Sequence, residues 1–414
     1  MKLALVDGAL GHTGSFLVKH LLEDGWKVVA TDLKKEDRDL VMTKEKVFSF
    51  ELKYLDCREW GSVTYIPADL TKIDTLRNLF SDDLFTEGKQ NYDAIFHPAS
   101  LYDYGAPYEL MHKINYDGLK NLLDVLFEHC KKSNTKPPRF LHWSTCGVYG
   151  EPKYQKDKKG FIYPIDETAP FNPPNNYSQT KTEQEKLIIK TAEENKDFKY
   201  TIIRPAPIYG PYQTYGMYHL FFMAYISGHF LLPIIFPKKK KLMMALIHVE
   251  DLVRAAIFLS DKKEAENEAF NVVNDPPLQE QWIQCLYDAT GSTYTIVPAP
   301  WFIYNIAAKL IFKFGALKAN KAHKYGIRTK FDLPSLGYLT HQYFFSNNKL
   351  KNLGFKFNYN DFVKGTYETV DWYLTNGWFP TTKWETQKYI KTEAKPPHKP
   401  KIEYKTPMEG GKIF

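Results

Sequence analysis

The chain has 414 residues, of which 43% are hydrophobic and 25% are charged, and its formal net charge is +7. This length allows one large α/β unit or two domains and excludes a small secreted module, and the composition excludes a disordered chain. The lysines are scattered and accompany no recognition motif, so we expect no nucleic-acid partner.

The cysteines and the first residues bear on location. No C-x-x-C pair or metal-ligand spacing occurs among the four cysteines, Cys57, Cys130, Cys146 and Cys285. We therefore expect no metal site and a reducing compartment, the cytoplasm. The opening "MKLALVDGALGHTG" has only a short apolar run and no small-residue cleavage site after it. It indicates a strand and not a signal peptide.

Residues 1–210 alternate short apolar runs with amphipathic stretches. The runs include "KLALVDG", "KVVATDL", "VTYIPADL", "YDAIFHPAS", "RFLHWSTCGVYG" and "KYTIIRPAPIYG". Continuous apolar strands that alternate with helices are typical of a parallel sheet covered on both faces. The pattern predicts an α/β fold with a doubly wound parallel sheet of the Rossmann type over residues 1–210, to which some later segments return.

Beyond residue 210 the regular alternation fades. Strand-like runs remain at "LIHVEDL" and "AFNVVND", and helices are expected near residues 278–290 and 361–376. We expect a smaller mixed α/β region over 211–380 that binds substrate. Residues 381–414 are rich in Lys and Pro and lack periodicity, which predicts an extended tail able to wrap a neighbouring subunit.

The stretch from Pro205 to Pro237 contains no Lys, Arg, Asp or Glu and is followed by four lysines. Its length would allow a membrane span, but several small or polar residues and a proline interrupt it. We favour the wall of an apolar substrate pocket or a subunit interface. A second apolar piece, residues 298–318, keeps peripheral membrane contact open as an alternative.

A glycine-rich turn follows the first strand. In "LVDGALGHTGSFLVKHLL", Gly8, Gly11 and Gly14 lie between a strand and a helix, where a dinucleotide pyrophosphate needs close backbone approach and amide donors. The next strand ends in Asp32, whose carboxylate can accept hydrogen bonds from the adenosine ribose. This favours NAD over NADP, although three basic residues leave NADP open: Lys34, Lys35 and Arg38.

The spacing G-x-x-G-x-x-G, together with Tyr177 and Lys181 four residues apart in "NNYSQTK", identifies a family resemblance. Residues 1 to about 380 resemble the extended short-chain dehydrogenases, the NAD-dependent epimerase/dehydratase superfamily. In motif detail they are most similar to the 3β-hydroxysteroid dehydrogenase and reductase branch. The resemblance implies an NAD(P)-dependent enzyme with a small-molecule substrate, and a homodimer.

The resemblance also assigns roles to residues. "PADL" matches the segment in which Asp69 bonds adenine and Leu70 flanks the ring, and "FHPAS" places Ala99 along the cofactor. "STCGVYG" supplies the catalytic hydroxyl, Thr145, and "NYDG" supplies Asn115, which would position a relay water. The implied cofactor set is Gly8, Gly11, His12, Thr13, Gly14, Asp32, Asp69, Leu70, Ala99, Tyr177 and Lys181; the implied catalytic set is Thr145, Tyr177, Lys181 and Asn115.

Hydride transfer from an alcohol needs a base for the hydroxyl proton. A free tyrosine has a pKa of about 10, and lowering it to about 7 takes roughly 4 kcal/mol of extra phenolate stabilisation. A lysine one helical turn away, together with the positive nicotinamide ring, is a source of that field. Tyr177 and Lys181 have this spacing, and Thr145 would share the substrate oxygen.

Three activities remain as hypotheses. Nucleotide-sugar members usually carry an Asn where this chain has Pro207, and 4,6-dehydratases carry Asp-Glu where it has Cys146 and Gly147. We therefore favour an oxidoreductase that interconverts a hydroxyl and a ketone on a fairly apolar, sterol-like or lipid-like molecule. The alternatives are a nucleotide-sugar epimerase or dehydratase, and an NAD-binding sensor without turnover.

Overall fold

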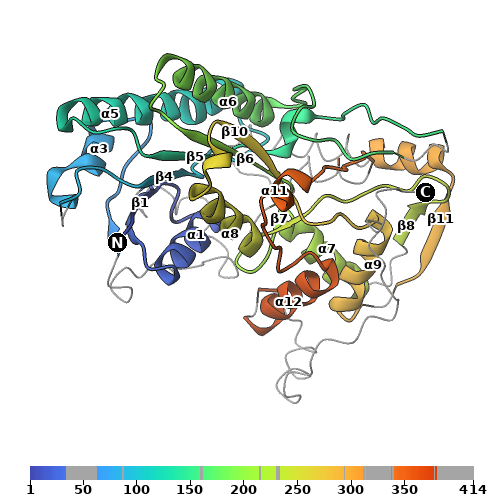
Figure 1. The fold of residues 1–414 in the computed structure, drawn as a ribbon. Coiled ribbons are helices and arrows are strands. Elements are labelled where there is room, and N and C mark those ends of the chain that lie inside the picture. The colour runs from blue at the N-terminus through green and yellow to red at the C-terminus, as the bar shows by residue number, and fades with distance from the viewer. Residues whose placement is uncertain are drawn as a thin grey trace.

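The computed structural model describes residues 1–33, 63–85, 88–158, 162–213, 216–229, 234–292, 294–310, 340–376 and 378–379, and positions 313 and 337. Within these ranges the largest sheet has seven strands, all parallel (Figure 1). The strands are β1 (Leu3–Val6), β2 (Lys27–Ala30), β3 (Val63–Tyr65), β4 (Ala94–His97), β5 (Arg139–Trp143), β6 (Tyr200–Pro205) and β10 (Glu268–Val272).

The spatial order of the strands is β10-β6-β5-β4-β1-β2-β3. The order reverses at β1, which pairs with β2 on one side and with β4 on the other. This is the doubly wound topology of Rossmann folds, in which ligands bind at the carboxyl ends of the strands beside the reversal. The prediction of a Rossmann-type parallel sheet is confirmed.

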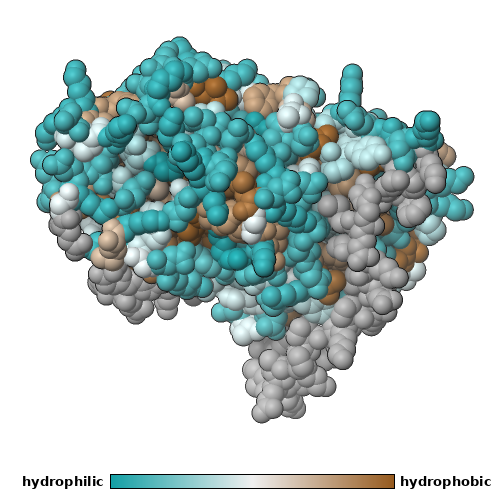
Figure 2. Space-filling view, viewed as in Figure 1, coloured by the Kyte–Doolittle hydropathy of each residue, from teal (hydrophilic) through white to brown (hydrophobic). Residues whose placement is uncertain are grey.

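Helices cover both faces of the sheet because successive strand residues point to opposite sides. Ala4 and Val6 of β1 belong to the apolar core under α1 (His12–Glu23) and α8 (Val249–Ser260). Leu3 and Leu5 belong to the core under α5 (Gly118–Ser133) and α6 (Asn176–Glu194). Figure 1 shows these two helical layers, and Figure 2 shows that the viewed face is largely hydrophilic.

A third apolar core lies in the remaining part of the chain. It is built around α7 (Tyr218–His229), α9 (Gln279–Ala289) and α12 (Phe362–Thr375), where Phe221, Trp282 and Tyr373 are fully buried. Two short parallel pairs accompany these helices: β7 (Ile208–Tyr209) with β9 (Ile247–His248), and β8 (Ile234–Pro237) with β11 (Ile296–Ala299).

Two segments from beyond residue 210, α8 and β10, pack with the large sheet and not with this third core. The division at residue 210 stays a prediction, and residues 381–414 lie outside the described part of the chain. The apolar stretch from Pro205 to Pro237 is shared among the end of β6, β7, α7 and β8. No helix among the described residues is long and apolar enough to cross a membrane.

A buried ion pair fastens α6 to the sheet. Arg204, the penultimate residue of β6, donates to both carboxylate oxygens of Glu185 on α6, at 3.0 Å from Nε and 2.6 Å from Nη2. The Ser144 hydroxyl, just after β5, also donates to Glu185. The remaining Arg204 donor, Nη1, reaches the Tyr149 hydroxyl at 2.7 Å. The guanidinium and carboxylate are therefore both paired and hydrogen bonded, as buried charges must be.

Replacing Arg204 with Met should destabilise the fold strongly, because Glu185 would remain as a buried charge without its partner. We expect a loss of about 3–5 kcal/mol in unfolding free energy, measured by urea denaturation. The matched control is Arg77→Met, which removes the exposed Arg77–Glu128 pair and should change stability little. Equal effects of the two substitutions would contradict the anchoring role of the buried pair.

Candidate active site

The candidate site lies at the carboxyl edge of the sheet, where β1, β4 and β5 end side by side. Gly8 follows β1, Ala99 follows β4 and Thr145 follows β5. Parallel strands bring these three turns to one edge, although they are far apart in the sequence.

The glycine turn packs tightly against the turn after β4. Gly8 has φ +55°, and a Cβ placed on it would lie 2.9 Å from the Ala99 Cα. A Cβ on Gly14 would lie only 2.1 Å from the Gly8 carbonyl oxygen, so any side chain there would force the turn open. Gly11 is the N-cap of α1 and has no side chain that could bond to the first N–H groups of the helix. The N-terminus of α1 is therefore suited to a pyrophosphate.

The two residues after Gly11 are buried within the first turn of α1. The His12 Nε2 lies 2.8 Å from the Pro211 carbonyl oxygen, and burial lowers the pKa of His12 to about 4. Thr13 is also buried. The contact with Pro211 joins the start of α1 to the segment that follows β7.

Asp32 lies immediately beside the glycine turn. One carboxylate oxygen accepts from the Leu10 backbone N–H at 2.9 Å, and the other accepts from the Leu33 N–H at 2.8 Å. The carboxylate is thus positioned by the turn that the pyrophosphate would approach. This placement suits the predicted contact with the adenosine ribose.

Asp69 and Leu70 are placed by the segment after β3. The Asp69 carboxylate accepts from the Thr71 N–H at 2.9 Å and lies 3.2 Å from the Lys72 Nζ. Burial raises the pKa of Asp69, but the bonds from Thr71 and Lys72 outweigh burial and hold the pKa below its ordinary value. Leu70 packs against Gly118, whose added Cβ would lie 2.9 Å from the Leu70 Cβ. The predicted adenine contacts of both residues stay predictions.

Thr145 and Tyr177 come together across a glycine contact. The Thr145 hydroxyl accepts from the Gly147 N–H at 3.0 Å, at the start of the 3₁₀ turn η6 (Cys146–Tyr149). A Cβ on Gly147 would lie 2.8 Å from the Ser178 Oγ, so η6 packs directly on the first turn of α6. Tyr177 lies in that turn, after the N-cap Asn175.

The Tyr177 ring is enclosed by aromatic residues and by Lys181. Tyr102 and Tyr104 contact it edge to face, with centroids 5.0 and 5.4 Å away. The Lys181 Nζ lies 5.9 Å from the ring centroid and donates to the Trp143 carbonyl oxygen at 2.7 Å. The structure therefore brings together Thr145, Tyr177 and Lys181.

Lys181 is almost completely buried, and burial lowers its pKa from 10.5 to about 7. The negative charges of Asp7 and then Glu185 act in the opposite direction and favour the ammonium form. Asp7 is held in turn by the Ala99 N–H at 2.8 Å and by the Nδ1 of His97. His97 stacks on His142, its register partner on β5.

These residues around Lys181 were not predicted as site residues. Asp7 and His97 bond to each other across 90 positions of sequence, which no local pattern reveals. The one available signal is that both lie at the carboxyl ends of strands expected to be neighbours. Both are fully buried, as is His142.

The Asn115 side chain bonds to Leu101 and Thr180, and not to Thr145, Tyr177 or Lys181. It sits in the π-helical turn η5 (His112–Asp117), and its side chain accepts from the Leu101 N–H at 2.7 Å and donates to the Thr180 hydroxyl at 3.1 Å. It therefore ties the loop that carries Tyr102 to α6. π-helical turns are frequent at functional sites, and the predicted water relay stays a prediction.

No group of three or more His, Cys, Asp or Glu residues suited to a metal ion occurs within the described ranges. Three cysteines, Cys130, Cys146 and Cys285, are buried and unbonded to one another, while Cys57 lies outside those ranges.

The profile of the NAD dependent epimerase/dehydratase family matches residues 4–273. Anthocyanidin reductase of Arabidopsis thaliana is 26% identical over 376 residues, which is 86% of this chain and 91% of that protein. The decarboxylating sterol-4-alpha-carboxylate 3-dehydrogenase of Saccharomyces cerevisiae is 26% identical over 210 residues, 50% of this chain and 51% of that protein.

In sequence, the chain matches about half the length, or less, of the plant UDP-glucose 4-epimerases and of the bifunctional protein of Kluyveromyces lactis. Among solved structures, the UDP-glucose 4-epimerase of Thermotoga maritima has a TM-score of 0.62 and 21% identity, with 90% of this chain and 99% of that chain covered. This likeness supports the Rossmann fold. The cofactor is NAD, as the family description states and as the glycine turn and Asp32 fit.

The buried Lys181 should make stability depend on pH in a definite direction. Its pKa is about 7 in the folded protein and near 10.5 in the unfolded chain. Between these values the unfolded chain binds more protons, so the contribution of Lys181 to stability rises with pH. The unfolding free energy of the wild type should therefore gain on that of Lys181→Met when the pH is raised from about 6 to about 9.

The exposed Lys186, on the same helix, supplies the control. The difference between wild type and Lys186→Met should stay constant over the same pH range. If the difference in unfolding free energy between wild type and Lys181→Met also stayed constant with pH, the pKa of Lys181 would not be lowered in the folded protein, which would contradict the prediction.

Proposed function

We propose that this chain, which belongs to the NAD dependent epimerase/dehydratase family, is an oxidoreductase that interconverts a hydroxyl and a ketone on a fairly apolar, sterol-like or lipid-like molecule. The observation that carries the proposal is the convergence of Thr145, Tyr177 and Lys181 beside the glycine turn. The glycine turn and Asp32 would hold NAD, which would supply the acceptor for the hydride of the carbinol carbon.

The residues would share the remaining work as follows. Tyr177 takes the hydroxyl proton of the substrate, and its ring is fixed by Tyr102 and Tyr104. The Thr145 hydroxyl accepts from the Gly147 N–H, which leaves its own O–H able to donate to a substrate oxygen. Lys181 supplies positive charge one helical turn from Tyr177, held in place by the Trp143 carbonyl.

Residues near Tyr177 support an apolar substrate. A Cβ on Gly216 would lie 3.7 Å from the Tyr102 hydroxyl, so part of the Pro205–Pro237 stretch, which lacks Lys, Arg, Asp and Glu, lies beside the ring that contacts Tyr177. Met217 follows and is buried in the third core. Pro207 offers only a carbonyl, which already accepts from the Ile247 N–H at 3.0 Å. A charged diphosphate would find few partners in these segments.

The direct test uses purified protein, NAD and a panel of sterol-like and other apolar secondary alcohols, with NADH fluorescence as the signal. Tyr177→Phe should reduce turnover by at least about 100-fold, because the general base is lost. Tyr163→Phe, at an exposed tyrosine, should leave turnover unchanged. NAD binding by Tyr177→Phe, measured by calorimetry, should persist and so separate loss of chemistry from loss of fold.

The matches to UDP-glucose 4-epimerases favour a second candidate, a nucleotide-sugar epimerase. That enzyme would interconvert sugar epimers and release no net NADH. Thermal unfolding with NAD present distinguishes the two, since a ligand that binds only the native state raises the unfolding temperature. We expect stabilisation by apolar alcohols and none by UDP-sugars. The reverse result would favour the epimerase, and tight NAD binding without turnover of any compound would favour a sensor.

A further inference from the structure

A helix at residues 301–310 exposes apolar side chains to solvent. Phe302, Ile303, Ile306 and Leu310 are between 49% and 64% exposed. At about 100° per residue these four positions lie within an arc of about 100° on one side of the helix. The opposite side carries the buried Tyr304 and Ala308. A surface helix normally presents a polar outer face, so this apolar face is unusual.

The adjoining two-stranded sheet extends the same surface. Ile235 of β8 and Val297 of β11 are register partners and are 46% and 41% exposed. β11 ends two residues before Trp301 begins the helix, and the Lys238 N–H, just after β8, donates to the Ala299 carbonyl oxygen at 2.8 Å, so the sheet adjoins the start of the helix. We call this region the apolar patch, and it consists of Ile235, Val297, Phe302, Ile303, Ile306 and Leu310. Patches of this kind commonly mark interaction sites.

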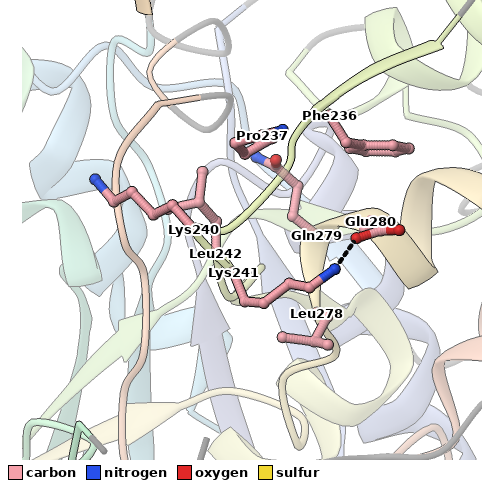
Figure 3. A pocket seen from close by; sticks show the side chains of 8 residues that line it. All are labelled: Phe236, Pro237, Lys240, Lys241, Leu242, Leu278, Gln279 and Glu280. Carbon is pink, nitrogen blue, oxygen red and sulfur yellow. Dashed lines mark hydrogen bonds and ion pairs between the residues drawn. The ribbon is translucent and has the colours of Figure 1, made fainter. Parts of the chain in front are cut away.

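Lysines border the patch, and the two sequence segments that supply it contain no acid. The exposed turn Lys238–Lys241 follows β8, and Lys240 lies 3.7 Å from the ring centroid of Trp301. Figure 3 shows Lys241 paired with Glu280 while Lys240 points away from that pair, beside a cavity of about 10 Å³. No Asp or Glu occurs in residues 205–249 or 289–331.

We propose that the apolar patch and the bordering lysines dock this protein onto the surface of an anionic lipid bilayer, with the 301–310 helix lying in the interface. Apolar side chains would enter the boundary between headgroups and acyl chains, and lysines would contact anionic headgroups. Trp301 and Tyr304 are the aromatic types enriched at that depth.

Charge favours a bilayer over a second copy of this chain. Two copies paired through the same patch in an isologous dimer would bring their lysine turns close together, and Glu280 already pairs with Lys241 of its own turn. An anionic bilayer offers the complementary charge and an apolar interior at once. The docking does not depend on the proposed oxidoreductase activity.

The test uses the full chain in flotation assays with phosphatidylcholine vesicles, with and without about one third phosphatidylserine, a content that makes the surface strongly negative. We expect binding to the anionic vesicles that weakens with salt. The double variant Phe302→Ser/Ile306→Ser and the double variant Lys238→Glu/Lys239→Glu should each bind at least tenfold more weakly. Leu110→Ser, at an equally exposed residue of α4 (Tyr108–Met111) outside the patch, should bind as the wild type does.

Native mass measured by light scattering accompanies each variant, and far-ultraviolet circular dichroism checks that each is folded. Absence of vesicle binding by the wild type, or binding that the two double variants retain, would overturn the proposal. If Phe302→Ser/Ile306→Ser instead halves the native mass while the wild type ignores vesicles, the patch is an interface between copies of this chain.

Discussion

The pairing of Glu185 with Arg204 is the interaction on which the geometry of the site depends. Glu185 lies four residues after Lys181, and Lys181 lies four residues after Tyr177, so all three project from one stripe of α6. The same carboxylate accepts from Ser144, the neighbour of Thr145. One buried carboxylate therefore fixes α6, which carries Tyr177, relative to the end of β5, just before Thr145.

Burial of Lys181 follows from this anchoring and gives the site its electrostatic character. A lysine held among packed residues loses hydration, and its charge survives only through nearby partners, here the Trp143 carbonyl and the carboxylates of Asp7 and Glu185. Burial lowers the pKa of Lys181 and these carboxylates raise it, and the resulting pKa of about 7 means that the ammonium and the neutral amine are both populated at neutral pH. Asp7 thus links the glycine turn to the charge state of Lys181 through space, independently of any cofactor contact.

Local pattern was sufficient for the sheet, the glycine turn and the start of α6, because each depends on residues close in sequence. The placement of Thr145 beside the turns after β1 and β4 was also predictable, since parallel strands end at one edge. The Asp7 and His97 pair was not, because it joins residues 90 positions apart and the motifs in which they lie assign no contact between them. The Pro205–Pro237 stretch was ambiguous for another reason: its apolar residues follow no single period, and only packing divides it into a helix and strands.

The chemistry of that stretch connects the proposed substrate with the proposed docking surface. Within it, Gly216 lies beside Tyr102 and hence near Tyr177, and its last strand, β8, supplies Ile235 to the apolar patch. An apolar alcohol partitions into bilayers and is scarce in water, which limits encounter with an enzyme in solution. A protein that rests on the bilayer with this segment between patch and tyrosine would meet such a substrate where it is concentrated. The absence of Lys, Arg, Asp and Glu along the segment would then serve both the docking and the passage of the substrate, since a permanent charge along it would oppose each.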